Sequence, residues 1–145
     1  HDAVLGRSSH VVGWHDIADW EDSQTLPGLV VYRYDAPLFF ANVEDFKARA
    51  LAAIVAESHP VEWFILNTEA IAEIDITAVD MLAAFHQELW SQGITFSMAR
   101  VKQDLYDQLD RSGLLQDLGA DHIYSNLSPA IAAFEARKHS ASTKP

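Results

Sequence analysis

From Gly28 to Lys138 the sequence alternates short apolar runs with longer segments of helical periodicity. The runs are rich in β-branched and aromatic residues, which favour strands, and they cover residues 29–34, 38–41, 63–66, 94–99 and 122–124. In the helical segments, apolar residues recur three or four positions apart. The resulting order, β-β-α-β-α-β-α-β-α, predicts right-handed crossovers onto one sheet. We therefore expect an α/β domain in which a mixed, largely parallel sheet carries about four helices, packed mainly on one face.

Capping residues indicate where these helices begin. Asn42 has the side chain of an N-cap, with Asp45 three residues further on, as in a relative of the capping box. Thr77 and Asp80 repeat this spacing before the second helix. The last helix is predicted to have Pro129 as its first helical residue, where a missing N–H costs nothing.

The two ends of the chain differ from the region between them. Residues 1–27 keep neither a helical nor a strand period for long and end in a turn-rich segment, which predicts a linker with at most one short strand near Val11. Small and polar residues dominate positions 140–145, which predicts a disordered tail. The predicted organisation is a linker over 1–27, one domain over 28–139 and a tail over 140–145.

Charge and composition exclude several classes of ligand and site. The 145 residues include no cysteine, which excludes disulfides, zinc–thiolate sites and thiol nucleophiles. A net charge of −11 opposes binding to nucleic acid and to anionic lipid, so neither is an expected partner. No apolar run approaches the roughly 20 residues of a membrane span, so we expect the fragment itself to be soluble.

The sequence offers little catalytic chemistry. It contains no phosphate-binding glycine loop and no nucleophile-elbow motif. His10 and His15 lie near several acidic residues, but a solvated acidic segment explains them better than a metal site does. Glu69, Glu73 and Asp75 could form a carboxylate pair for acid–base catalysis, although a solvated loop is the simpler interpretation. We expect a protein that is not an enzyme and has no metal site.

One segment, Glu73–Leu82, places an acidic residue and a hydroxyl at a predicted helix start directly after a buried strand. One interpretation is simply a capped helix. The other is a phosphorylatable or anion-facing hydroxyl on Thr77, because a helix N-terminus offers unpaired N–H groups. A phosphate on Thr77 would add about −1.5 to −2 charges, which Asp75 and Asp80 would repel, so the modification would act as a switch.

The same segment carries a resemblance to a known family. The stretch Asn67–Thr68, followed by Ile74–Ala78 and Leu82, resembles the signature loop of STAS domains, named for sulfate transporters and anti-sigma factor antagonists. The segment Gly28–Asn42, which ends in Leu-Phe-Phe-Ala-Asn, is similar to the start of the STAS domain in SulP-type anion transporters. Val4–Arg7 also resembles the stretch that leaves the last membrane helix of such transporters.

This resemblance implies a STAS-type fold and a non-catalytic regulatory or assembly role. The chain would be the C-terminal domain of a secondary-active transporter for sulfate or a related anion, at the cytoplasmic face of the plasma membrane. Its expected partners are the transmembrane domain of the same parent chain and a cytosolic regulatory protein.

The resemblance also suggests site residues. In soluble anti-sigma antagonists the loop reads Asp-Ser-Ser-Gly, and its second hydroxyl is phosphorylated. Asp75, Thr77 and Ala78 occupy the first, third and fourth of these positions, with Ile76 replacing the first serine. This match leaves an alternative function, a free-standing antagonist-like module that is switched by phosphorylation at Thr77.

Purine nucleotides, GTP or ATP, are the regulatory ligands that the resemblance implies. We expect weak binding where the helix starts at Asn42 and Thr77 approach each other, with Phe39 or Phe40 stacking on the base.

Overall fold

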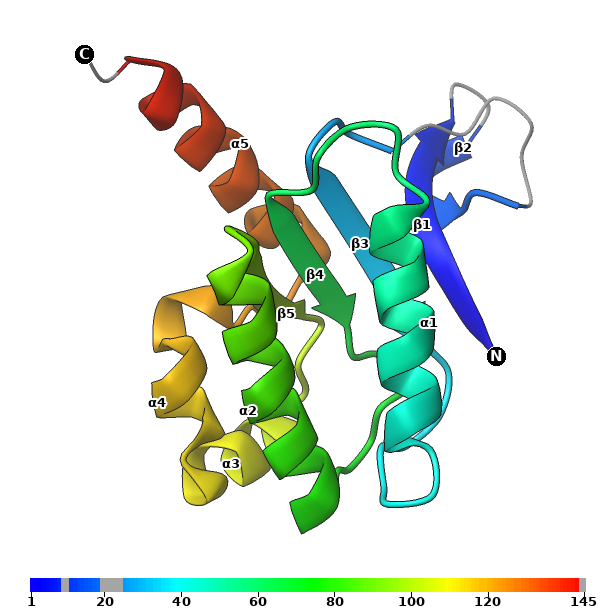
Figure 1. Ribbon diagram of the computed structural model, residues 1–145, viewed down its shortest axis with the longest axis vertical. Helices are drawn as coiled ribbons and strands as arrows, with labels where there is room; N and C mark the ends of the chain where they lie inside the picture. The colour runs from blue at the N-terminus through cyan, green and yellow to red at the C-terminus, as the bar shows by residue number, and fades with distance from the viewer. Residues whose placement is uncertain (9–10, 19–24, 144–145) are drawn as a thin grey trace.

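The computed structural model describes residues 1–8, 11–18 and 25–143. Its strands form a five-stranded mixed sheet in the order β2-β1-β3-β4-β5 (Figure 1). Strands β3, β4 and β5 are parallel to one another, whereas β1 pairs antiparallel with both β2 and β3. The strands are β1 (Asp2–Ser8), β2 (Val11–Asp16), β3 (Leu29–Tyr34), β4 (Trp63–Asn67) and β5 (Thr95–Ala99). The mixed sheet expected from the sequence is thereby confirmed.

Helices cover both faces of this sheet, but unequally. Four pack on one face, and their apolar side chains share one core: α1 (Val43–Val55), α2 (Ile76–Ser91), α3 (Gln103–Ser112) and α4 (Leu114–Leu118). On the opposite face, α5 (Leu127–Thr143) forms a second, smaller core and passes behind β4 in Figure 1. The predicted preference of the helices for one face is confirmed.

Alternation along the strands divides the apolar side chains between these two cores. Tyr32 and Phe64 face α1 to α4, where Phe64 contacts Phe85 and Phe96 with ring centroids 5.7 and 5.9 Å apart. Val31 belongs to the core beneath α5. Burial of each such side chain contributes about 1.5–3 kcal/mol, so β4 is stabilised from both sides, as its apolar run predicts.

The linker predicted over residues 1–27 is wrong for most of its length. Residues 2–8 and 11–16 form β1 and β2, and β1 is an interior strand of the sheet. Its inward residues Ala3 and Leu5 are only 6% and 2% exposed. Two apolar residues are too few to give a visible period, and the partners of β1 lie about 30 positions away, in β3. The short strand expected near Val11 is present as β2.

Two other predicted strands are reduced to single bridges. In the segment 38–41, Leu38 alone pairs, with Ile74, and Phe39 and Phe40 are exposed. In the segment 122–124, Ile123 alone pairs, with Met98, after a short 3-10 helix over Ala120–His122.

The last helix differs from its prediction at both ends. It begins at Leu127, so Pro129 is its third helical residue, where the absent N–H is still one that the helix leaves unpaired. It continues to Thr143 through most of the predicted tail. Residues 144 and 145 lie outside the described part of the chain.

Candidate functional site

The predicted site residues lie on two loops at the carboxyl ends of β3 and β4. The loop 35–42 leads from β3 to α1, and the loop 68–75 leads from β4 to α2. They meet in a parallel bridge, in which the Leu38 N–H donates to the Glu73 carbonyl at 3.2 Å and the Asp75 N–H donates to the Leu38 carbonyl at 3.1 Å. The bridge brings Phe39 and Phe40 next to the start of α2.

Asp75 joins the two loops through its side chain. Its Oδ1 accepts the Ala78 N–H at 2.8 Å, so Asp75 is the N-cap of α2. Its Oδ2 accepts the Phe40 N–H from the other loop, also at 2.8 Å. The prediction that Thr77 caps this helix is therefore wrong. Thr77 is an exposed second residue of the helix, because the carboxylate two positions earlier already reaches the N–H that a cap must satisfy.

Asn42 stands at the N-cap position of α1, as predicted, but its side chain does not cap the helix. Its Oδ1 accepts the Phe39 N–H at 3.0 Å, and its Nδ2 donates to the Pro37 carbonyl at 2.8 Å. Asn42 therefore closes its own loop. Asp45 does not complete a capping box either, since its carboxylate accepts the Tyr34 hydroxyl at 2.7 Å.

The second loop is held at both of its ends. At its start, the buried Thr68 hydroxyl lies 3.1 Å from the Ala99 carbonyl and 3.2 Å from that of Arg100. At its end, the Gln108 amide of α3 accepts from the Ile74 N–H and donates to the Ile74 carbonyl, each at 3.2 Å. Sequence reasoning missed Gln108, because nothing local to α3 indicates this contact.

Large apolar side chains are exposed at this junction. Phe40 and Ile76 are each 72% exposed and Phe39 is 41% exposed. The two phenylalanine rings meet edge to face with centroids 5.8 Å apart. We call Phe39, Phe40 and Ile76 the apolar tip.

A cavity of about 410 Å³ opens beside the apolar tip. Its lining residues are Pro37, Leu38, Phe39, Glu73, Ile74 and Asp75. This lining contributes two carboxylates and no basic side chain, so an anion is not favoured inside the cavity itself. The predicted residues Asn42, Thr77 and Ala78 do not line it.

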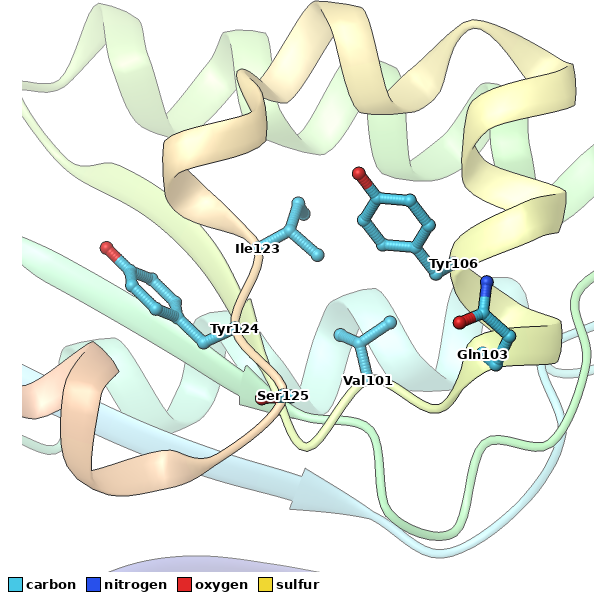
Figure 2. Close-up of a pocket in the computed structure, with 6 residues that line it drawn as sticks. All are labelled: Val101, Gln103, Tyr106, Ile123, Tyr124 and Ser125. Atoms are coloured by element: carbon cyan, nitrogen blue, oxygen red, sulfur yellow. The ribbon is translucent and has the colours of Figure 1, made fainter.

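A second cavity, of about 330 Å³, lies past the end of β5 (Figure 2). In Figure 2, Tyr106 and Gln103 approach it from α3, the Tyr106 ring is turned toward Ile123, and Tyr124 points away from it. Val101 and Ser125 complete the lining, which holds no acidic or basic side chain. No local sequence pattern indicates this cavity, since its residues come from two segments about 20 positions apart.

The candidate acid–base residues in the described part of the chain are divided between two places. Glu69 forms an ion pair with Arg100 at 2.7 Å, away from the pair Glu73 and Asp75. Within residues 1–8, 11–18 and 25–143, no group of three or more potential ligands could hold a metal ion. His10, one of the residues considered, lies outside the described residues.

A polar network anchors β1 to α1 and β3. The hydroxyl of Tyr32 donates to Asp2, and Arg49 of α1 contacts Asp2 at 3.3 Å and Asp45 at 3.0 Å. Burial, together with the hydrogen bond to Asp45, raises the pKa of Tyr34 to about 12. The hydrogen bond from Tyr34, followed by that from Arg49, lowers the pKa of Asp45. At neutral pH the Tyr34 hydroxyl therefore stays protonated and the Asp45 carboxylate stays ionised.

Comparison with known proteins identifies the family. Residues 22–130 match the STAS domain, so the chain belongs to the STAS domain family. It is 50% identical over 137 residues to a probable sulfate transporter of Mycobacterium tuberculosis, a match that covers 94% of this chain and 24% of the transporter. The chain thus spans about a quarter of the length of this relative. None of the helices in the described part has the length and hydropathy to cross a membrane.

Solved structures share the fold. The murine anion transporter Slc26a9 in its inward-facing state matches with a TM-score of 0.83 and 17% identity, over 94% of this chain and 22% of that one. The STAS domain of a SulP transporter from Vibrio cholerae matches with a TM-score of 0.67 and 21% identity, over 86% and 94%. A putative anti-sigma factor antagonist of Thermotoga maritima matches with a TM-score of 0.64 and 15% identity, over 76% and 90%.

Proposed function

We propose that this chain is a non-catalytic regulatory or assembly domain of a secondary-active transporter for sulfate or a related anion. It would lie at the cytoplasmic face of the membrane and act on the transmembrane domain that precedes it in the same polypeptide. The observation that carries the proposal is the 50% identity over 137 residues to a probable sulfate transporter four times as long. The site supports a binding role, because three exposed apolar side chains, those of the apolar tip, lie together beside a cavity.

The test is uptake of labelled sulfate by the full-length parent transporter and by a version that lacks this domain. Quantifying each protein in the membrane separates assembly from transport rate. We expect the deletion to lower either the amount of transporter in the membrane or the uptake per molecule. Equal amounts with equal uptake would refute the proposal, as would a parent gene without membrane segments.

Weak binding of GTP or ATP stays part of this proposal. What supports it is the exposed Phe40 ring, since an aromatic face stacks on any nucleobase. The carboxylates of Glu73 and Asp75 would direct the phosphates outward, toward solvent. A titration monitored by NMR should shift signals around Phe40, and Phe40→Ala should abolish those shifts while Tyr106→Ala, in the other cavity, leaves them. No shift at millimolar nucleotide would end this part of the proposal.

A phosphorylation switch is the second candidate function. The exposure of Thr77 on the first turn of α2 favours it, as does the fold shared with an anti-sigma factor antagonist. A phosphate there would add about −1.5 to −2 charges two positions from the Asp75 carboxylate and weaken its link to Phe40. Kinase treatment of cell extract with mass spectrometry tests the idea, and modification of other hydroxyls with Thr77 left unmodified would count against it.

A further inference from the structure

The apolar tip is unusual because it is both exposed and held in place. Phe40 and Ile76 are each 72% exposed and Phe39 is 41% exposed, and a cluster of exposed apolar side chains is more informative than a single one. The Asp75 carboxylate binds the Phe40 N–H and the first turn of α2, so both residues flank one anchor. A preordered surface loses little conformational entropy when a partner binds.

The negative charge around the apolar tip limits the kinds of partner that can bind there. Glu44 follows the Phe39–Phe40 loop as an exposed residue of the first turn of α1. Asp80 lies one turn after Ile76 on α2, and Glu73 lines the cavity beside Phe39. These carboxylates, in a chain of net charge −11, repel anionic lipid headgroups and a second copy of the same acidic surface.

The apolar tip lies at the same end of the sheet as the start of the chain. The Asp35 N–H donates to the His1 carbonyl at 2.9 Å. His1 therefore lies beside Asp35, which is two positions before the segment Pro37–Asn42. Any polypeptide that precedes His1 in a longer parent chain enters the domain at this end of the sheet. Cytoplasmic loops of membrane proteins carry an excess of Lys and Arg, which complements an apolar surface surrounded by carboxylates.

We propose that the apolar tip, Phe39, Phe40 and Ile76, docks against basic cytoplasmic loops of the transporter's own membrane domain. This inference rests on the proposed function and specifies its contact surface. Asp75 is the positioning residue, because it holds both halves of the tip in one arrangement.

The test uses the full-length transporter with a photo-reactive phenylalanine at the position of Phe40, Ile76 or Trp90. Trp90 is a matched control, since it is aromatic, 61% exposed and near the other end of α2, about 21 Å from Ile76 at about 1.5 Å per residue. We expect adducts from positions 40 and 76 that map by mass spectrometry to Lys- or Arg-rich loops of the membrane domain, with none from position 90. Adducts to lipid, adducts to the tip of a second copy, or no adduct at positions 40 and 76 would each overturn the inference.

A pair of variants provides an independent readout. Phe40→Ser and Ile76→Ser replace exposed side chains, so the melting temperature should not change, and each should cause loss of the adduct formed from the other position. Trp90→Ser should leave both adducts intact, and adducts that persist in the Phe40→Ser and Ile76→Ser variants would contradict the docking.

The outcomes separate this inference from the proposed function. If uptake depends on the domain but position 40 forms no adduct, the docking surface is wrong and the regulatory role stands. If the adducts form but deletion of the domain changes neither uptake nor assembly, the surface is correct and the regulatory role fails.

Discussion

The two helices that start at the candidate site are held in different ways, although an Asx residue stands at the N-cap of each. Asp75 uses its two oxygens to cap α2 and to hold the neighbouring loop. Asn42 leaves α1 uncapped and folds its own loop instead. The first turn of α1 is fixed through Asp45, which accepts from Tyr34 of β3. Position relative to a helix therefore does not define the role of a capping residue, because a nearby loop can compete for its hydrogen bonds.

The largest expected effect comes from Asp75→Ala. It removes a cap worth about 0.5–2 kcal/mol and a charge-assisted bond worth about 1.5–3 kcal/mol. We expect the free energy of unfolding to fall by about 2–4 kcal/mol in urea denaturation, given that the two contributions are not fully additive. Asp75→Asn, which keeps one acceptor oxygen, is the matched control and should lose less. Equal losses would mean that the one hydrogen bond that asparagine can still accept contributes nothing.

A smaller and pH-dependent effect is expected from Tyr34→Phe. The native fold lowers the pKa of Asp45, chiefly through Tyr34, so the unfolded chain binds the proton first as the pH falls. The stabilising contribution of Asp45 is present above its unfolded pKa of about 4 and is lost as the pH falls through the lower native value. Removing the hydroxyl should make the free energy of unfolding depend less steeply on pH below about pH 4. An unchanged slope in acid denaturation curves would contradict this account.

Asn42→Ala should be milder still. Its two bonds are neutral and partly solvated, so we expect a loss of about 1 kcal/mol. Faster hydrogen exchange at the Phe39 N–H, with α1 unchanged, would confirm that Asn42 closes a loop. Fraying of the first turn of α1 in the same measurement would show that it caps the helix after all.

Thr77→Ala should have the smallest effect, within about 0.5 kcal/mol of zero. Thr77 is exposed and the cap is provided by Asp75. A loss as large as that of Asp75→Ala, measured under the same conditions, would reverse the assignment of the cap.

The sequence predicted the elements whose patterns are long and local. The apolar run in β4 and the amphipathic repeat in α2 need no distant partner to be recognised, and both are present. Phe39 and Phe40 depart from their prediction, because an apolar run predicts burial in a strand and these two rings are 41% and 72% exposed. A functional surface is a place where such local rules are expected to fail.

The details of the site depend on contacts between distant segments. Spacing alone predicted Thr77 as the cap of α2, whereas the structure places Asp75 there, and Asp75 also accepts a hydrogen bond from Phe40, 35 positions away. β1 was not predicted for the same reason, since this strand is held by its pairing with β3 and by the ion pair between Asp2 and Arg49. Pairings of this range leave no periodic trace in the sequence.

The interior position of β1 has a mechanical consequence. β1 is hydrogen-bonded to β3 on one side and to β2 on the other, and its first residues pair with the last residues of β3. A pull on His1 along the strand therefore loads many backbone hydrogen bonds at once, in shear, instead of opening them one after another. A force that reaches the domain through its N-terminus would move the sheet as a rigid body before it could detach the strand.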